Sequence, residues 1–497
     1  MSFDVEYDVV VVGSGASGKS AAYTIASESD LSVVLLEKAP ETGGTSIYAE
    51  GQCAWNSSET RAREVPDFPG ELPEGAHFPT YSEFVNGYIQ LSHYRANYDV
   101  VSAFAKNSGE TIDILKNLGV VYAEVGYYSG AEPDELFVFH RPEGMSARCQ
   151  EVLLRACENG GVDIFCNTPA KELILDDAGA VIGVVAEDAD GEELRIGSKA
   201  LILATGGFGN SDELVGKYSW MPQLAIHNLH CVASENIGEG LMMALKAGAD
   251  TSNIGTLMVS GCPVGKTPGS HIYGGGIQPF LWVNSQGRRY CNEGVATSFS
   301  HMGNTIGQLN DCTSYTIMDQ NAIKLLEEGS GSLISTGDFC PLGGNLERLS
   351  EEMDDSVAAN DGAAFKGDTI EELAEAMGVD PQLFRTTVDR YNELCKLGVD
   401  EDFCKQPEFL IAITDGPFYA IRIAPDILVS CGGIRVNGDM QVTDSHYVPI
   451  PGLYAVGMEA SGLYGDCYSI NCPGTANGFA HTSGRIAARH AIKVIEG

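Results

Sequence analysis

The sequence predicts an α/β fold in which one strand-and-helix domain is interrupted by an inserted segment. Three glycine-rich turns, each following an apolar run typical of a buried strand, support this prediction. They are GSGASG at 13–18, ATGGFG at 204–209 and YAVG at 454–457. Because these turns lie at both ends of the chain, the residues between the second and the third are expected to form a separate domain.

The first turn has the spacing of a Rossmann-like dinucleotide fingerprint. Gly13 permits the tight turn, Gly15 lets the backbone approach a pyrophosphate, and Gly18 allows close packing of helix on strand. The following small-residue helix offers free N–H groups to the phosphates. Glu37 ends the next apolar run and is placed to accept the ribose hydroxyls. The pattern predicts nucleotide binding.

Charge and composition narrow the class of protein. The formal net charge of -38 argues against nucleic acid and anionic membrane surfaces as partners. No apolar run approaches the roughly 20 residues of a membrane span, and the acidic segment 1–8 leads directly into the first strand, so we expect no signal peptide. The spacing of the 14 cysteines matches no common metal-binding or haem-binding motif. We therefore expect a cytoplasmic protein with reduced thiols and no metal site.

Local patterns predict several further elements. Residues 98–119 have helical periodicity, residues 172–187 form a hairpin, and residues 475–495 form the last helix. Asp368 is predicted to cap a helix, with Glu371 completing a capping box.

Four more segments support a family resemblance: GGTSIYAEG at 43–51, GEGLMMALKAGAD at 238–250, VNSQGRRYCNE at 283–293 and TTVDRYNELCKLGVDEDF at 386–403. Together with the three turns, the chain resembles the flavoprotein family of fumarate reductase and the 3-ketosteroid dehydrogenases. The resemblance implies a glutathione-reductase-type FAD-binding domain with an inserted α+β capping domain, and FAD held without a covalent bond. It also implies hydride transfer between flavin N5 and a carbon of an activated C=C bond.

The expected domain boundaries follow from this resemblance. The FAD-binding domain comprises residues 1–254 and 431–497, and the capping domain comprises residues 255–430. Only one dinucleotide fingerprint is visible, so the electrons are expected to come from, or go to, a separate donor or acceptor.

The residues expected to bind FAD lie at the glycine turns and at the start of the last helix. They are Gly13, Ser14, Gly15, Ala16, Ser17, Gly18, Glu37, Lys38, Gly43, Gly44, Thr45, Ser46, Gly51, Ala170, Thr205, Gly206, Gly207, Gly457, Met458, Glu459, Gly474, Thr475 and Ala476. The resemblance implies an acid directly after Gly457, where this chain has Met458 followed by Glu459.

The positions that hold dicarboxylates in fumarate reductases carry neutral residues in this chain. The resemblance places Thr297 where fumarate reductases have a proton-donating arginine and ketosteroid dehydrogenases have a tyrosine. It places Val429 at a histidine, Asn471 at an arginine, and Ser260 and Tyr273 near a histidine and a glutamate. Because a buried unpaired charge costs many kcal/mol, we expect a neutral or singly charged, fairly apolar substrate, such as a ketosteroid or an aryl enone or enoate.

Reduction of an enone needs a proton donor and a group that polarises the carbonyl oxygen. The candidates are Tyr468 and Tyr464 in the loop before the last helix, His301 one helical turn after Thr297, and Tyr273; Tyr127 and Tyr128 rank below them. Each is equally consistent with a packing role. Arg289 and Glu293 are predicted to form a structural pair between cap and base.

Two other interpretations stay open at this stage. One is a fumarate-reductase-like enzyme acting on a small carboxylate that is held by arginines elsewhere in the chain. The other is a flavin-binding subunit that passes electrons to a partner without turnover. The sequence also leaves open whether the C=C bond is reduced or introduced.

Overall fold

The computed structural model describes residues 2–62, 77–126, 138–227, 236–335, 342–468 and 472–497. The chain forms two compact units, each described here by itself. The first unit comprises Met1–Trp220, Val232–Met258 and Val429–Gly497, and the second comprises Met221–Cys231 and Val259–Leu428.

The first unit is built on an eight-stranded sheet with a parallel centre. The parallel strands run in the order β18 (Pro449–Ala455), β9 (Glu193–Leu203), β1 (Val5–Val12), β2 (Val33–Leu36) and β6 (Asp163–Phe165). Val12 pairs with both Leu36 and Leu203, and Leu203 pairs with Ala455. The carboxyl ends of these strands therefore meet at one edge of the sheet, and all three glycine turns start there.

Antiparallel strands extend this sheet. Strand β17 (Gln441–Thr443) pairs with β18, while β7 (Ala170–Leu175) and β8 (Val181–Glu187) form a hairpin beside β9. The hairpin predicted at 172–187 is therefore confirmed. Two small sheets also belong to this unit. One consists of β3 (Gln52–Cys53), β5 (Phe139–Pro142) and β4 (Tyr122–Gly126), and the other of β10 (Thr251–Ser252) and β16 (Gly433–Ile434).

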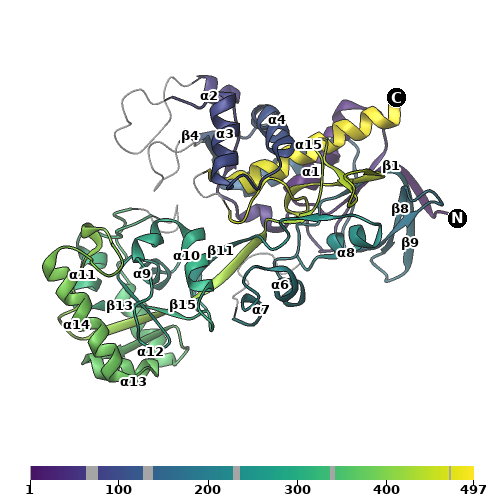
Figure 1. Cartoon of the computed structure of the whole chain (residues 1–497). Helices are drawn as coiled ribbons and strands as arrows, with labels where there is room; N and C mark the ends of the chain where they lie inside the picture. The colour runs from purple at the N-terminus through teal and green to yellow at the C-terminus, as the bar shows by residue number, and fades with distance from the viewer. Residues whose placement is uncertain (1, 63–76, 127–137, 228–235, 336–341, 469–471) are drawn as a thin grey trace. The chain divides into compact units, whose positions relative to one another are not determined.

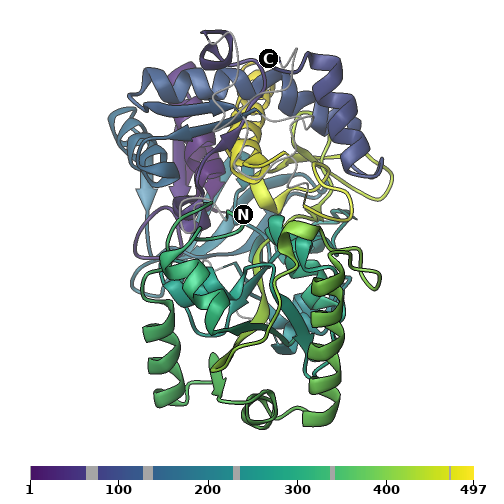
Figure 2. The same ribbon diagram turned by 90° about the vertical axis from the view of Figure 1, so that its left-hand side faces the viewer.

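Two helices from opposite ends of the chain pack together in the first unit. Figures 1 and 2 show α1 (Ala16–Glu28, purple) beside α15 (Thr475–Glu496, yellow). Gly484 lies at their contact, where a Cβ atom would be 2.2 Å from the carbonyl oxygen of Ser17. Helix α4 (Tyr98–Asn117) packs against α15. The helices predicted at 98–119 and 475–495 are therefore present. The remaining helices of this unit are α2 (Ser58–Ala62), α3 (Tyr81–Leu91), α5 (Met145–Asn159), α6 (Asp212–Tyr218) and α8 (Glu239–Lys246).

The second unit has a five-stranded sheet surrounded by helices. Its strands are β11 (Leu257–Pro263), β12 (Leu281–Asn284), β13 (Ser314–Asp319), β14 (Ala364–Gly367) and β15 (Phe418–Ser430), and β15 pairs antiparallel with both β13 and β14. Its helices are α7 (Leu224–His227), α9 (His271–Gly276), α10 (Phe299–Gly307), α11 (Gln320–Glu328), α12 (Leu349–Ala359), α13 (Ile370–Met377) and α14 (Pro381–Leu397). Buried residues such as Leu281, Phe384 and Tyr391 join the sheet to α13 and α14.

One predicted cap is wrong by a residue. Thr369, not Asp368, caps α13, because its hydroxyl accepts from the N–H of Glu372 and the Glu372 carboxylate accepts from the N–H of Thr369. Glu371 instead forms an ion pair with Arg385. Asp368 with Glu371 and Thr369 with Glu372 both have the spacing of a capping box, so the sequence pattern alone does not choose between them. In the parts of the chain that the structure describes, no helix has the length and apolar character needed to cross a membrane.

Candidate functional site

The first glycine turn joins β1 to α1. A Cβ atom on Gly13 would lie 2.4 Å from the carbonyl oxygen of Ala204, and one on Gly18 would lie 1.8 Å from that of Gly13. Strand, turn and helix therefore pack in contact only because glycine occupies both positions. At Gly15 the nearest atom to such a Cβ is Ser46 Oγ, at 3.4 Å. Packing within the protein does not demand glycine there, which is consistent with a position kept small for an approaching ligand.

Polar groups from three loops meet beside the N-terminus of α1. Ser14 donates from its backbone N–H and its hydroxyl to Glu37 Oε2, at 3.0 Å and 2.5 Å. Ser46 Oγ accepts from the N–H of Ala16 at 3.0 Å, and Ser14 Oγ accepts from the N–H of Gly43 at 3.3 Å. The N-cap residue Gly15 provides no side-chain cap for α1, and the first turn of the helix has no acidic residue. Apart from that of Ala16, the N–H groups of this turn therefore remain suited to an anion.

The loop after β2 adds several predicted residues. Gly43 and Gly44 have φ angles of 140° and 55°, a region that favours glycine. Thr45 Oγ1 accepts from the side-chain amide of Asn236 at 3.1 Å. Lys38 Nζ forms an ion pair of 2.5 Å with the carboxylate of Glu239, the first residue of α8. Asn236 was not predicted, because no local pattern marks it.

Gly51 and Ala170 are the predicted residues on neighbouring strands. Gly51 directly precedes β3, and a Cβ there would lie 2.3 Å from the carbonyl oxygen of His140. Ala170 begins β7 and is buried.

Glu459 connects the second and third glycine turns. Its Oε2 accepts from the hydroxyl of Thr205 and from the N–H of Gly207, the latter at 3.0 Å. The residue is 1% exposed, and burial raises the pKa of its carboxyl group. Its Oε1 has no hydrogen-bond partner in the described parts of the chain. A buried polar atom in that state is suited to completing its hydrogen bonds with a ligand.

The third turn packs directly on the two long helices. Gly457 has a φ of 63°, its N–H donates to Ser483 Oγ on α15 at 2.9 Å, and a Cβ there would lie 2.7 Å from Ser17 Oγ on α1. Met458 is buried beside it. In the second turn, Gly206 and Gly207 have φ angles of 85° and 84°.

The N-terminus of α15 begins at Gly474. This residue has a φ of 76°, and a Cβ on it would lie 2.7 Å from the backbone nitrogen of Cys53. The carbonyl oxygen of Gly474 accepts from that same N–H at 2.9 Å. No side chain caps the helix, so the first-turn N–H groups, including that of Ala476, are not bonded to a capping side chain.

The structure brings together two of the predicted catalytic tyrosines. The ring centroids of Tyr464 and Tyr468 are 5.3 Å apart, and both side chains are buried. The Tyr464 hydroxyl is hydrogen-bonded to Thr475 Oγ1 at 3.0 Å. Burial raises the pKa of both phenols above the usual value, although the Thr475 hydroxyl acts to lower them. Both tyrosines therefore remain protonated near neutral pH and act as donors.

A third phenol completes this group. Tyr88 on α3 is 1% exposed. Burial raises the pKa of Tyr88, and a hydrogen bond from the Thr475 hydroxyl acts to lower it, as in the other two tyrosines. We call Tyr88, Tyr464, Tyr468 and Thr475 the Thr475 cluster. Sequence reasoning missed Tyr88 because it lies on the apolar face of an ordinary amphipathic helix.

The other two catalytic candidates belong to the second unit. His301 lies exposed on α10. Tyr273 lies on α9, with its hydroxyl 3.5 Å from Cys262 Sγ. The Cys262 thiol also donates to Asp426 Oδ2 at 3.4 Å. Neither residue is part of the Thr475 cluster.

The positions that depart from fumarate reductase are neutral in the structure as well. The Thr297 hydroxyl donates to the carbonyl oxygen of Gly294 at 2.9 Å, which ends a short 3-10 helix. Ser260 and Val429 are buried on β11 and β15. Asn471, Tyr127 and Tyr128 lie outside the described residues.

Four charged side chains form a buried network in the second unit. Arg289 Nη2 lies 2.7 Å from both Glu293 Oε2 and Asp400 Oδ2, and Lys405 Nζ lies 3.4 Å from Glu293 Oε2. We call these residues the Glu293 network. The predicted pair of Arg289 and Glu293 is present, but its placement between cap and base is wrong, because all four residues lie within one unit. Asp400 and Lys405 complete the charge balance and hold the pair inside the unit.

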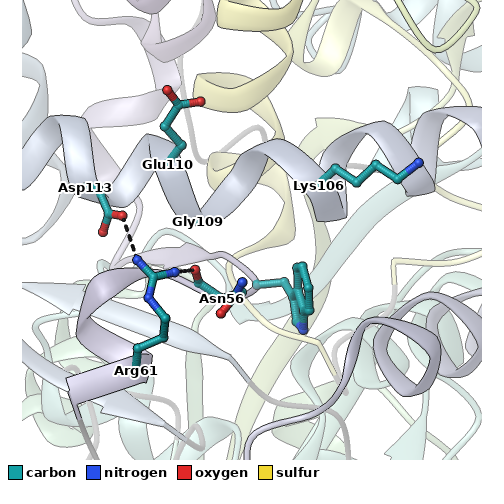
Figure 3. Close-up of a pocket in the computed structure, with 7 residues that line it drawn as sticks. Asn56, Arg61, Lys106, Gly109, Glu110 and Asp113 are labelled. Carbon is teal, nitrogen blue, oxygen red and sulfur yellow. Dashed lines mark hydrogen bonds and ion pairs between the residues drawn. The ribbon is translucent and has the colours of Figure 1, made fainter.

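A cavity of about 270 Å³ opens on the first unit, but none of the predicted site residues lines it. Figure 3 shows Arg61 reaching from α2 toward Asp113 on α4, at 3.3 Å, and toward the carbonyl oxygen of Asn56. Glu110, another lining residue, is paired with Arg485 and Arg489. Because these charges already compensate one another, we interpret the residues around this cavity as stabilising the fold.

The cofactor implied by the sequence fits the residues around the glycine turns. The uncapped N-termini of α1 and α15 offer amide groups to anionic or electron-rich atoms, and Glu459 keeps one buried carboxylate oxygen unbonded within the described chain. The packing of Gly13 and Gly18 makes the tight turn that a dinucleotide site needs. Among the described residues, no group of three His, Cys, Asp or Glu side chains comes together as a metal site would require.

Comparison with known proteins gives a consistent result. The FAD binding domain family matches residues 8–471. The vinyl phenol reductase of Lactiplantibacillus plantarum is 33% identical over 498 residues, covering 98% of this chain and 96% of that protein. A cytochrome fumarate reductase of Shewanella frigidimarina is 27% identical, covering 98% of this chain and 77% of that protein. The 3-ketosteroid delta1-dehydrogenase structure from Sterolibacterium denitrificans shares the fold, with a TM-score of 0.78 at 20% identity, covering 98% of this chain and 100% of that one.

Proposed function

Because the chain belongs to the FAD binding domain family and is a flavin-dependent oxidoreductase acting on carbon–carbon double bonds, we propose that it reduces the vinyl group of a neutral aromatic substrate such as a vinyl phenol. The relative that carries this substrate in its name is similar over nearly the full length of both chains. In our proposal the second unit serves as the capping domain, as expected from the sequence.

The observation that carries the proposal is the neutrality of the predicted substrate positions. Thr297, Val429, Ser260 and Tyr273 are uncharged, and the Thr475 cluster consists of hydroxyl groups. A substrate carboxylate buried against any of these groups would lack a counter-ion, at a cost of several kcal/mol. A neutral aryl alkene carries no such cost.

The residues predicted to bind FAD would hold it at the three glycine turns and at the N-terminus of α15. When bound, FAD supplies the hydride-transferring atom N5 of the isoalloxazine ring. Tyr468 is our choice for the proton donor to the alkene carbon, because its phenol is buried and stays protonated near neutral pH. Tyr464 positions Thr475 through their 3.0 Å hydrogen bond. Burial of the cluster excludes water from the proton that Tyr468 holds.

The reductant is proposed to be a separate electron carrier. The chain shows a single dinucleotide fingerprint at 13–18, which the flavin occupies in our proposal. We further propose that FAD is held without a covalent bond and that the protein works in the cytoplasm. Acid precipitation should then release all the flavin into the supernatant, and cell fractionation should recover the protein with cytoplasmic markers.

The test of function is anaerobic reoxidation of the dye-reduced holoenzyme. We expect the absorbance of oxidised flavin to return on addition of 4-vinylphenol, and not on addition of fumarate. A ketosteroid and a cinnamate complete the panel and set the substrate range. Reoxidation by fumarate alone would overturn the proposal in favour of a small-carboxylate enzyme. Failure of every alkene would favour an electron-transferring subunit.

A further inference from the structure

Two thiols of the first unit lie in contact although they are far apart in the sequence. Cys53 Sγ, on β3, lies 3.5 Å from Cys472 Sγ, in the segment that leads into α15. Both are free cysteines, and both are buried. The sulfur atoms of a disulfide lie about 2.05 Å apart, so these two need to approach each other by about 1.5 Å to form one.

The backbones that carry the two thiols are in contact as well. The N–H of Cys53 donates to the carbonyl oxygen of Gly474 at 2.9 Å. A Cβ atom on Gly478, in the first turns of α15, would lie 2.1 Å from the carbonyl oxygen of Cys53. A bond between the two sulfur atoms would therefore join segments that already pack directly against each other.

Both segments belong to the part of the chain that is expected to hold FAD. Gly51 directly precedes β3, and Gly474, Thr475 and Ala476 lie at the start of α15. A cofactor enclosed between packed segments leaves the protein when those segments open locally. A covalent bond between β3 and the segment before α15 would restrict that opening.

Hydrogen peroxide can supply the oxidation. Peroxide oxidises the Cys472 thiol to a sulfenic acid, the O–O bond breaks, and one water leaves. The Cys53 thiol then attacks this sulfur, the S–S bond forms, and the proton of Cys53 leaves with the hydroxide as a second water. Burial, followed by the hydrogen bond and the charge of Cys472, raises the pKa of the Cys53 thiol well above its usual value. Cys53 therefore keeps its proton while Cys472 reacts first.

We propose that Cys53 and Cys472 form a redox-sensitive disulfide, which hydrogen peroxide closes and which then holds β3 against the start of α15 and slows the release of FAD. Because both sulfur atoms are buried, peroxide reaches them when this part of the unit opens locally, and the new bond prevents further opening. A thiol reductant restores the open form. The inference goes beyond the proposed function and does not depend on the substrate.

The first test is the linkage itself. Reduced holoenzyme is treated with hydrogen peroxide, the remaining thiols are alkylated in denaturant, and a proteolytic digest is analysed by mass spectrometry. We expect a pair of peptides joined through Cys53 and Cys472 that separates after treatment with dithiothreitol. In Cys53→Ser the pair should be absent, and dimedone should trap the Cys472 sulfenic acid. Cys404→Ser is the matched control, because Cys404 is exposed and lies in the second unit, and it should form the linked pair.

The second test is the rate at which FAD leaves the protein, followed by the rise of flavin fluorescence after dilution into mild urea. We expect peroxide to lower this rate at least about fivefold in the unmodified protein and in Cys404→Ser, and dithiothreitol to restore it. Cys53→Ser and Cys472→Ser should release FAD at the same rate before and after peroxide. Neither test uses an alkene, so the proposed function stands or fails separately.

Three results would overturn the inference. Absence of the linked peptides at peroxide concentrations that oxidise Cys404 would show that the two thiols do not pair. Linked peptides with an unchanged or faster release of FAD would show that the bond does not hold the cofactor. A slowed release that persists in Cys53→Ser would assign the effect to another residue. If the serine variants do not fold, the linked peptides and the reversal by dithiothreitol in the unmodified protein decide.

Discussion

The Glu293 network of the second unit and the Thr475 cluster of the first bury polar side chains in opposite ways. In the network, two cations and two anions compensate each other at 2.7–3.4 Å. In the cluster, three phenol groups share the neutral hydroxyl of Thr475, which lies 3.0 Å from the Tyr464 hydroxyl. Balanced charge holds one unit together, whereas the other buries neutral groups that keep their protons near neutral pH.

Glu293→Ala tests the structural half of this comparison and should have the largest effect. The substitution leaves Arg289 and Lys405 with Asp400 as their remaining anion, so we expect a loss of about 3–5 kcal/mol in the free energy of unfolding. Urea denaturation followed by circular dichroism measures it. Arg385→Ala, which breaks an exposed pair with Glu371, should cost less than about 1 kcal/mol. Similar costs for the two variants would contradict the distinction between buried and exposed pairs.

Tyr468→Phe tests the proposed catalytic role of the Thr475 cluster. Loss of the proposed proton donor should lower kcat for 4-vinylphenol by about 10²-fold, within the range of general acid catalysis. KM should change little, because the ring remains. Single-turnover reoxidation of the reduced flavin measures the step directly. Tyr122→Phe, which removes another buried hydroxyl on β4, serves as the control. An unchanged kcat in Tyr468→Phe would move the role to His301 or Tyr273.

The glycine turns and Glu37 were predictable because their chemistry is encoded in a few adjacent residues. Gly13 and Gly18 form the close contacts expected of the fingerprint, and Ser14 meets Glu37 beside the start of α1. The family comparison confirms the fold, the cofactor and the class of reaction. The predicted roles of the individual residues stay predictions.

Contacts between segments distant in the sequence were not predictable. Tyr88 lies in a helix whose apolar periodicity says only which face is buried, and its position beside Thr475 depends on how α3 packs in the unit. Asp400 and Lys405 likewise join Arg289 through the tertiary fold, and no local pattern marks them. The same limit explains why the Arg289–Glu293 pair was foreseen but its location was not.

Lys19 is a buried cation of the first unit that has fewer hydrogen-bonding and charged partners than Lys405 of the second. Its Nζ donates to Gln150 Oε1 at 3.4 Å, whereas Lys405 has Glu293, the Tyr391 hydroxyl and a carbonyl oxygen around it. We expect Lys19→Met to raise stability at pH 7 by about 1–2 kcal/mol, and Lys405→Met to lower it.

Lys19 should also make the free energy of unfolding depend on pH. Burial lowers the pKa of Lys19 to about 8, while an unfolded lysine has a pKa of about 10.4. Between these values the unfolded chain binds a proton that the folded chain does not, so stability rises from about pH 8 to about pH 10. The rise should be smaller in Lys19→Met. An identical pH profile in the variant would show that Lys19 keeps its proton in the folded protein.

Tyr464→Phe gives the smallest effect. The substitution breaks the 3.0 Å bond to Thr475, so we expect it to lower the free energy of unfolding by about 1 kcal/mol. Thermal unfolding of the two proteins measures the difference, and an unchanged stability would mean that this buried hydrogen bond makes no net contribution to the fold.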